Sequence, residues 1–248
     1  MFHYNIQSES LRRTELSNMA GSSIKVLGTR PSPFVNRVEI ALNIKSVDYE
    51  FITEDIFNKS ELLLNSNPAH KKIPVLIHGN KPICESLVIV QYIDETWTNG
   101  PSILPSDPHD RAIARFWATY VENKWFPFML EVREAVGKDE KEAALQKIVE
   151  GLCLLEEAFV KCSKGKDFFG GDNIGYIDIT LGCFLGWIRA MEMMLGLNLI
   201  YEAQTPGLAG WAERFLSEKV VKDVILSPDK LVEIYSLLQA QKQGASAN

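Results

Sequence analysis

Residues 24–53 read IKVLGTRPSPFVNRVEIALNIKSVDYEFIT, and this stretch decides how the chain begins to fold. Residues 24–27 form a short, partly β-branched run, and apolar residues recur at helical spacing over 34–42. Residues 49–53 then alternate aromatic and polar side chains, as strands do. A strand, a helix and a second strand in this order predict a right-handed crossover between two parallel strands.

The segments that follow add two more strands. We expect a polar helix over 59–65 and a strand over 75–77. The Gly-Asn pair at 79–80 predicts a tight turn into an antiparallel strand over 82–84, and a helix over about 87–97 closes the unit. Residues 23–97 are therefore predicted to form one α/β domain.

The rest of the chain is predicted to be helical. Residues 98–108, TNGPSILPSDP, are rich in Pro, Gly and Ser and predict a linker. Residues 109–248 predict an all-helical domain, with further helices over 176–195, 208–216 and 229–241. Two apolar stripes at helical spacing support this, the first of Ile113, Phe116, Trp117, Tyr120 and Val121, the second of Ile148, Leu152, Leu155 and Phe159.

Composition excludes several classes of protein. The net charge of -6, with lysines scattered among acidic residues, argues against nucleic-acid binding. No run approaches the roughly 20 apolar residues that a membrane span needs. Residues 1–18 have no apolar core of a secretory signal, so residues 1–22 are expected to form a loose extension.

The four cysteines, Cys84, Cys153, Cys162 and Cys183, show no CxxC spacing and no partnered histidine cluster. This pattern argues against a zinc site and against dithiol redox chemistry. Reduced structural thiols are the simplest interpretation, and they predict a cytosolic protein.

Ser32 stands where the first predicted strand meets the first predicted helix. It is a good N-cap, and Pro33 suits the first helical position, so its hydroxyl is expected at the positive end of the helix dipole. A hydroxyl donor there would stabilise a thiolate, and lowering a thiol pKa by about 2 units needs roughly 2.7 kcal/mol. The alternative is that Ser32 only caps its own helix.

Two further segments have the features of a binding site. Pro74 precedes a strand, and a cis bond there would free the backbone of Ile73 to pair with an extended peptide, although trans is the more common form. Glu85 and Ser86 stand at the next helix start, where backbone amides and a hydroxyl suit a ligand carboxylate and Glu85 suits an amine. A peptide with a carboxylate, an amine and a thiol would satisfy all three segments.

These motifs resemble the tau class of plant glutathione transferases. The resemblance rests on PSPF at 31–34 with Arg37, on Asn58-Lys59-Ser60, on NPAHKKIPVLIHGNKPICES at 67–86 and on FFGGDNIGYIDI at 168–179. It covers residues 24–238, and it implies a thioredoxin-like N-terminal domain with a mixed four-stranded sheet, an all-α C-terminal domain and a homodimer.

The resemblance also implies roles for single residues. Ser32 would activate the thiol, and Lys59 and Lys72 would bind the glycine end of glutathione. Ile73 would supply backbone hydrogen bonds before a cis Pro74. Glu85 and Ser86 would hold the γ-glutamyl end.

The resemblance implies a pocket for the electrophile between the domains. It would be lined by Thr29, Arg30, Phe34, Phe126, Leu130 and Trp187. Tau members often carry aromatic residues where this chain has Thr29 and Arg30, which extends the expected electrophiles to polar or anionic ones. For Phe126 and Trp187, ordinary core packing is an equal alternative.

The resulting hypothesis is a glutathione transferase that conjugates small hydrophobic electrophiles, with glutathione as co-substrate and no metal or tightly bound cofactor. Asp178 is expected to be structural, because its carboxylate can reach back to the start of its own helix. Two other functions stay open. One is peroxidase turnover through the sulfur of glutathione, and the other is a non-catalytic carrier of apolar ligands on the same fold.

Overall fold

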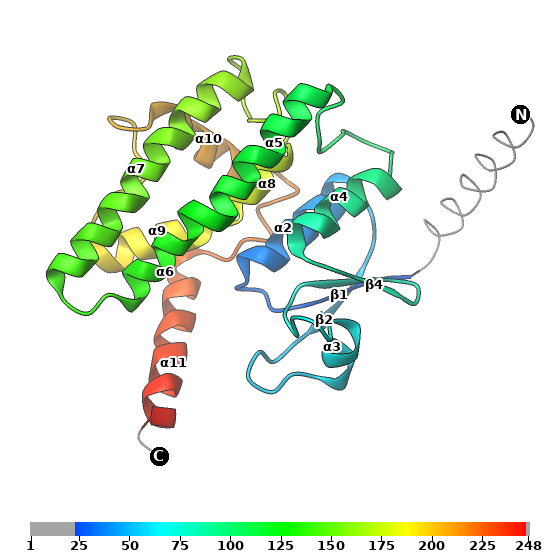
Figure 1. The fold of residues 1–248 in the computed structure, drawn as a ribbon, viewed down its shortest axis with the longest axis horizontal. Coiled ribbons are helices and arrows are strands. Elements are labelled where there is room, and N and C mark those ends of the chain that lie inside the picture. Colours follow the sequence, from blue (N-terminus) through cyan, green and yellow to red (C-terminus); the bar gives the residue numbers. More distant parts are fainter. Residues whose placement is uncertain (1–22, 247–248) are drawn as a thin grey trace, which may run out of the picture. The chain divides into compact units, whose positions relative to one another are not determined.

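The computed structural model describes residues 23–246, and these fall into two units (Figure 1). The first unit ends at Pro101 and the second begins at Ser102. This division lies inside the segment 98–108 that the sequence predicts as a linker. The extension predicted over 1–22 lies outside the described residues.

The described part of the first unit is an α/β domain. In chain order its elements are β1 (Ile24–Gly28), α2 (Pro33–Ile44), β2 (Glu50–Thr53), α3 (Glu61–Ser66), β3 (Val75–His78), β4 (Lys81–Cys84) and α4 (Ser86–Thr96). The four strands form one sheet in the order β2-β1-β3-β4. The β1 and β2 strands are parallel, and the other neighbours are antiparallel. The predicted mixed sheet is therefore confirmed.

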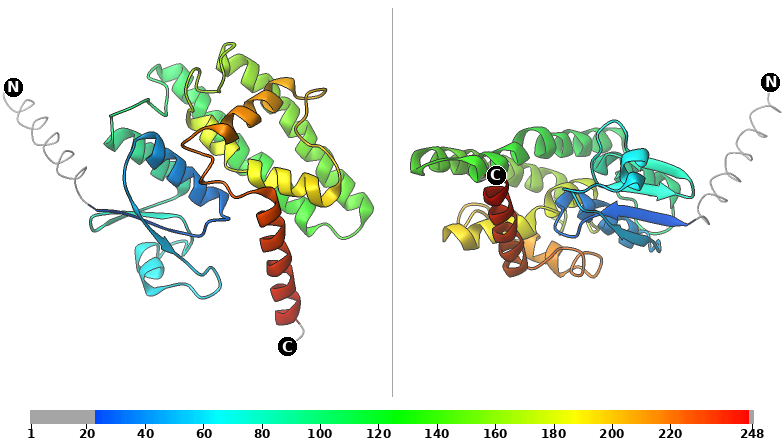
Figure 2. Two further views of the ribbon diagram at one scale, coloured as in Figure 1. Left: turned by 180° about the vertical axis from the view of Figure 1, so that it is seen from behind. Right: turned by 90° about the horizontal axis from the view of Figure 1, so that it is seen from below.

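Helices cover both faces of this sheet. The α2 and α4 helices pack together on one face, and α3 lies on the other (Figures 1 and 2). On the α3 side, Leu63 packs with Leu27, Val75 and Ile77 of the central strands, and all four are buried. Central strands that are covered on both faces need apolar side chains on both, which explains the buried Val26 and Leu27 in β1 and the run Val75-Leu76-Ile77 in β3.

The described part of the second unit is entirely helical in its regular structure, as predicted. Its elements are α5 (Pro108–Tyr120), the short π-helix η1 (Val121–Trp125), α6 (Phe126–Glu134), α7 (Lys138–Ser163), α8 (Tyr176–Gly182), α9 (Leu185–Leu195), α10 (Pro206–Ser217) and α11 (Pro228–Ser246). Among the described helices, none has both the length and the apolar character that crossing a membrane requires.

The single helix predicted over 176–195 is wrong, because α8 and α9 are separate helices. The last turn of α8 tightens, and the Phe184 N–H donates to the carbonyl of Leu181 at 3.0 Å. The ring of Phe184 then stacks on Phe126, with ring centroids 4.8 Å apart. Contacts with a segment distant in sequence thus accompany the end of α8, and the periodicity of the sequence does not predict such contacts.

The apolar stripe predicted for α5 is also wrong in part. Phe116 is 59% exposed, whereas the small residues Ala114 and Ala118 are buried. The α5 helix packs against α8, and small side chains on that face let the two helices approach closely. The stripe predicted on α7 is confirmed, since Ile148, Leu152, Leu155 and Phe159 are all buried.

Asp178 organises the start of α8 from a fully buried position. Its Oδ2 accepts the N–H groups of Gly170 and Gly175 at 2.9 and 2.8 Å, so the carboxylate reaches back to the helix start as predicted. Its Oδ1 accepts from the Phe169 N–H at 2.9 Å and from Trp211 Nε1 at 2.7 Å. Burial raises the pKa of Asp178 to about 6, and these four hydrogen bonds oppose the rise.

Candidate functional site

One edge of the sheet collects the predicted glutathione-binding segments. Leu27 near the end of β1 pairs with Val75 at the start of β3, and Val75 pairs with Cys84 at the end of β4. Gly28 pairs with Thr53 at the end of β2. The turn before α2, the segment before β3 and the start of α4 therefore leave the sheet at the same edge, as does the loop after β2.

Ser32 is the N-cap of α2, with Pro33 in the first turn of the helix. Its Oγ accepts the Val35 N–H at 3.4 Å, and its own N–H donates to the Thr29 carbonyl at 3.0 Å. The cap bond uses a lone pair of the oxygen, so the hydroxyl proton stays available for donation to a ligand. The positive end of the helix dipole adds to the attraction for an anion at this hydroxyl.

The segment before β3 is shaped by Asn67, which is buried. Its Nδ2 donates to the carbonyl of Lys72 at 2.9 Å, and its Oδ1 accepts the His70 N–H at 3.1 Å. The side chain of Lys72 is exposed, and the Ile73–Pro74 peptide bond is cis, as the resemblance implies. The backbone that precedes β3 is thus held by a side chain that we did not predict.

At the start of α4, Glu85 and Ser86 have different environments. Ser86 is buried, and its Oγ accepts from Nη1 of the fully buried Arg37 at 3.0 Å. The Glu85 side chain is 61% exposed, and its carboxylate lies 3.8 Å from Nε2 of His70. The backbone of Glu85 has a positive φ of 70°, a strained conformation for a residue with a side chain, and such strain concentrates at binding sites.

The loop after β2 holds Lys59 at the surface. Glu54 is buried and accepts from both the Oγ and the N–H of Ser60, at 2.7 and 3.3 Å. Ser60 in turn caps α3 by accepting the Leu63 N–H at 3.1 Å. Glu54 therefore fixes the backbone directly after Lys59, whose own side chain is exposed.

Three predicted electrophile-pocket residues, Thr29, Arg30 and Phe34, lie around the Ser32 turn. The Arg30 guanidinium is not free, because its Nη1 lies 2.6 Å from Oε1 of the buried Glu39. Its charge is therefore neutralised within the first unit. Phe34 is partly buried, and the guanidinium of Arg37 lies 5.0 Å from the centre of its ring.

The other three, Phe126, Leu130 and Trp187, belong to the second unit. All three are partly buried. Phe126 stacks on the buried Phe184, a contact that fits the packing alternative for this residue.

Two other features of the second unit have some character of a site. A trio suited to a metal, Asp107, His109 and Asp110, lies at the start of α5 among the described residues. Asp107 caps α5 through the Asp110 N–H, and Asp110 pairs with Lys164 at 3.0 Å. These contacts give both carboxylates structural roles.

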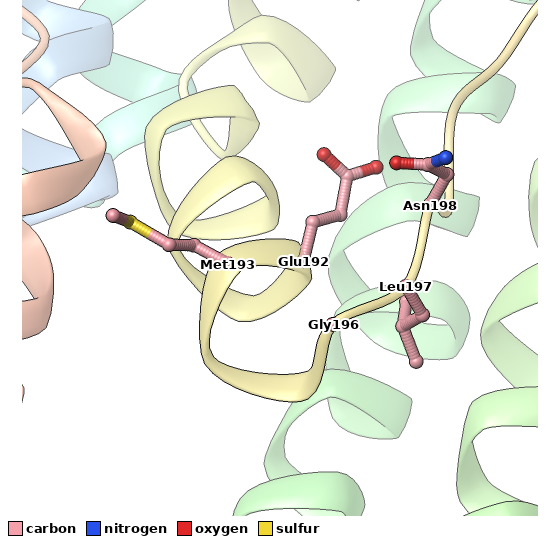
Figure 3. Close-up of a pocket in the computed structure, with 5 residues that line it drawn as sticks. All are labelled: Glu192, Met193, Gly196, Leu197 and Asn198. Carbon is pink, nitrogen blue, oxygen red and sulfur yellow. The ribbon is translucent and has the colours of Figure 1, made fainter.

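A shallow hollow of about 280 Å³ lies at the end of α9 and is lined by Glu192, Met193, Gly196, Leu197 and Asn198 (Figure 3). The Glu192 carboxylate accepts the N–H groups of Leu199 and Ile200, at 2.7 and 3.1 Å, and binds Arg189 at 2.9 Å. Both carboxylate oxygens of Glu192 thus bind groups of the chain itself, and the side chain secures the segment that follows α9.

Sequence reasoning missed the side chains that support the site. The sequence marks Arg37 only as part of a motif, and it predicts no role for the side chains of Asn67 and Glu54. Each is a buried polar residue with partners across a turn or between elements. A polar residue inside an otherwise apolar or loop segment is the available signal, but it does not name the partner.

Comparison with known proteins identifies the family of this chain. The family model described as glutathione S-transferase, N-terminal domain, matches residues 22–95, and the one described as glutathione S-transferase, C-terminal domain, matches residues 138–214. Glutathione S-transferase U17 of Arabidopsis thaliana is 55% identical over 216 residues, which cover 87% of this chain and 95% of that protein. Glutathione S-transferase U18 of the same plant is 50% identical over 226 residues, covering 91% of this chain and 100% of that protein.

Solved structures give the same result. A tau-class glutathione S-transferase from mango, Mangifera indica, is 57% identical and matches with a TM-score of 0.85 over 87% of this chain and 98% of its own. Rice GST1 in complex with glutathione is 34% identical, with a TM-score of 0.81 over 89% of this chain and 97% of its own. The chain belongs to the tau class of the glutathione S-transferases.

Proposed function

We propose that this enzyme ionises glutathione at Ser32 and conjugates the resulting thiolate to small hydrophobic electrophiles, as in detoxification. The observation that carries the proposal is the register of the sheet. It brings the Ser32 cap, the Ile73 backbone and the start of α4 to one edge, where a short extended peptide can bind to all of them.

The hydroxyl of Ser32 acts as a hydrogen-bond donor and is not itself the nucleophile. The sulfhydryl of glutathione loses its proton to solvent, and the Ser32 hydroxyl and the end of α2 stabilise the sulfur anion. The thiolate then attacks an electrophilic carbon and forms a C–S bond. In a substitution, the leaving group departs with the electrons of the broken bond. In an addition to an activated double bond, the carbanion that forms takes up a proton.

The rest of glutathione is bound by its two carboxylates, its amine and its backbone. In our proposal, Lys59 and Lys72 bind the glycine carboxylate, and Ile73 pairs with the cysteinyl backbone. Ser86 accepts from Arg37, so its own hydroxyl proton is available to the γ-glutamyl carboxylate. Glu85 pairs with the γ-glutamyl amine.

We propose that Thr29, Arg30 and Phe34, which lie around the Ser32 turn, contact the electrophile. For Phe126, Leu130 and Trp187 of the second unit, the pocket role stays a prediction. Because Glu39 neutralises the charge of Arg30, neutral apolar electrophiles are preferred over the anionic ones that the sequence also allowed. This preference is measured by comparing turnover of a neutral and an anionic electrophile of the same ring system.

Three further proposals concern the setting of the enzyme. We propose a homodimer, for which the loop before α3 offers the exposed Phe57, 64% accessible. We also propose that the protein is cytosolic and that it uses no tightly bound cofactor. Sedimentation of the parent and of Phe57→Ser tests the first of these, with a monomeric parent contradicting it.

The decisive experiment compares Ser32→Ala with Asp107→Ala. Both variants remove the side chain that caps a helix, and each is expected to lose about 1 kcal/mol of stability. Only Ser32→Ala is expected to lose conjugation and to raise the pKa of bound glutathione, measured by thiolate absorbance. Unchanged turnover in Ser32→Ala would show that the role given to Ser32 is wrong.

The two alternative functions are separated by the same assays. Turnover of organic hydroperoxides with glutathione, lost in Ser32→Ala, would add peroxidase activity through the same thiolate. Tight binding of apolar ligands with negligible consumption of thiol across a panel of electrophiles would instead favour the carrier.

A further inference from the structure

A buried carboxylate anchors the turn that carries Ser32. Glu39, on α2, is fully buried, and its Oε1 lies 2.6 Å from Nη1 of Arg30. The hydroxyl of Tyr49, directly before β2, donates to the same oxygen at 2.8 Å. The guanidinium of Arg30 also lies 4.2 Å from the centre of the Phe51 ring in β2. Arg30 thus joins the turn to both α2 and β2.

The electrostatics of this cluster depend on Arg30. Burial raises the pKa of Glu39, and the Tyr49 hydrogen bond and the charge of Arg30 oppose that rise. The second oxygen, Oε2, is buried and has no hydrogen-bond partner in the described part of the chain. Most of the interactions that compensate for burying this carboxylate therefore come through its first oxygen, and loss of Arg30 removes the cation among them.

Arg30 is held by its backbone as well as by its side chain. Its carbonyl accepts from Nδ2 of Asn36 at 3.3 Å, and the turn is closed by the hydrogen bond from the Ser32 N–H to Thr29 at 3.0 Å. Only one residue separates Arg30 from Ser32. A displacement of the Arg30 guanidinium should therefore also displace the backbone of Ser32.

We propose that the cluster of Arg30, Glu39 and Tyr49 positions the Ser32 hydroxyl for its hydrogen bond to the sulfur of glutathione. This inference rests on the proposed function and adds positioning residues to it. Hydrogen bonds weaken steeply when the donor–acceptor distance grows or the angle departs from linear. Small displacements of a reacting group also reduce reaction rates strongly. Glu39 and Tyr49 are proposed to touch neither the sulfur nor the electrophile. Because Arg30 is also proposed to line the electrophile pocket, its action through Ser32 is read from bound glutathione alone.

The test measures bound glutathione directly, without an electrophile. Thiolate absorbance is titrated in the parent and in Arg30→Met, Arg30→Lys and Tyr49→Phe. Lys25→Met is the control, because it breaks an exposed ion pair with Glu50 that also links β1 to β2. Circular dichroism and thermal unfolding identify the variants that fold.

We expect Arg30→Met to raise the apparent pKa of the bound thiol by about one unit, and Tyr49→Phe by less. The kcat of conjugation in Arg30→Met should fall about tenfold below the thiol pKa and recover above it, since each pKa unit changes the thiolate fraction about tenfold. The KM for glutathione should change less than about twofold. Arg30→Lys should recover part of the effect, and Lys25→Met should match the parent.

An unchanged thiol pKa in folded Arg30→Met would overturn the proposal, and so would a shift of equal size in Lys25→Met. If Arg30→Met does not fold, Tyr49→Phe decides, because it removes a single hydroxyl. The result also separates this proposal from the proposed function. A protonated thiol in the parent contradicts the proposed function, whereas a shift in Ser32→Ala alone contradicts only the positioning role.

Discussion

The buried side chain of Arg37 donates to the hydroxyl oxygen of Ser86 at 3.0 Å and joins α2 to the first residue of α4. Glu85 occupies the N-cap position of α4, and its side chain makes no capping hydrogen bond there. The Arg37 contact therefore fixes the helix start at which we propose that the γ-glutamyl carboxylate binds.

Arg37→Met should destabilise the fold by about 3 kcal/mol, because it removes a charge-assisted hydrogen bond and leaves polar groups unpaired in the interior. It should also raise the KM for glutathione while leaving the thiol pKa near that of the parent. Urea unfolding and steady-state kinetics measure the two effects. Equal stability of Arg37→Met and the surface variant Lys25→Met would contradict this reading.

Asn67→Ala should weaken glutathione binding without touching the ligand. The side chain holds the Lys72 carbonyl and the His70 N–H, so its loss frees the segment that leads to Ile73. We expect a stability loss of about 2 kcal/mol and a severalfold rise in the KM for glutathione. The exposed Asn65 in α3 provides the control, and Asn65→Ala should leave both quantities unchanged.

Asp178 should give the fold a pH dependence of defined sign. Its pKa in the folded protein is about 6, above the ordinary value of 3.8, so the folded state binds the proton more tightly than the unfolded state. The stability that this group contributes is full below about pH 4 and declines by roughly 3 kcal/mol as pH rises to about 6 and beyond.

Asp178→Asn should remove that pH dependence and lose hydrogen bonds at the start of α8. Denaturant unfolding from pH 4 to pH 7 measures it, and the difference in unfolding free energy from the parent should be largest at the acid end. The exposed Asp172, paired with Lys166, serves as control in Asp172→Asn. A difference that grows toward pH 7 would show that the hydrogen bonds outweigh burial.

Lys45→Met should be far more costly than Lys161→Met. The Lys45 side chain is 1% exposed, lies 2.7 Å from Asp94 and donates to the Pro101 carbonyl at 2.8 Å. Its loss leaves Asp94 without this cation in a buried setting, at a cost of roughly 3–5 kcal/mol. Lys161 pairs with Glu157 on the surface, where water screens the pair and little change is expected. Thermal unfolding of the two variants compares them directly.

Local sequence predicted most elements because local forces specify them. The Ser32 and Pro33 cap marks the start of α2, and the Gly-Asn pair at 79–80 marks the β3 to β4 turn. The hydrogen bond from the Gly175 N–H to the Asp178 carboxylate was also predictable, because the two residues are only three positions apart. Where prediction failed, at the break after α8 and at exposed Phe116, partners distant in sequence decide the outcome.

By itself, the sequence determined the order of strands and helices, the all-helical second half, and the family whose motifs mark Ser32, Ile73 and Ser86. These features follow from periodicity, caps and turns, which act over a few residues. Only the tertiary structure decided that Arg37 meets Ser86 and that Arg30 is neutralised by Glu39. Such pairs form when folding removes polar groups from water and each must find a partner, and sequence spacing does not say which partner comes within reach.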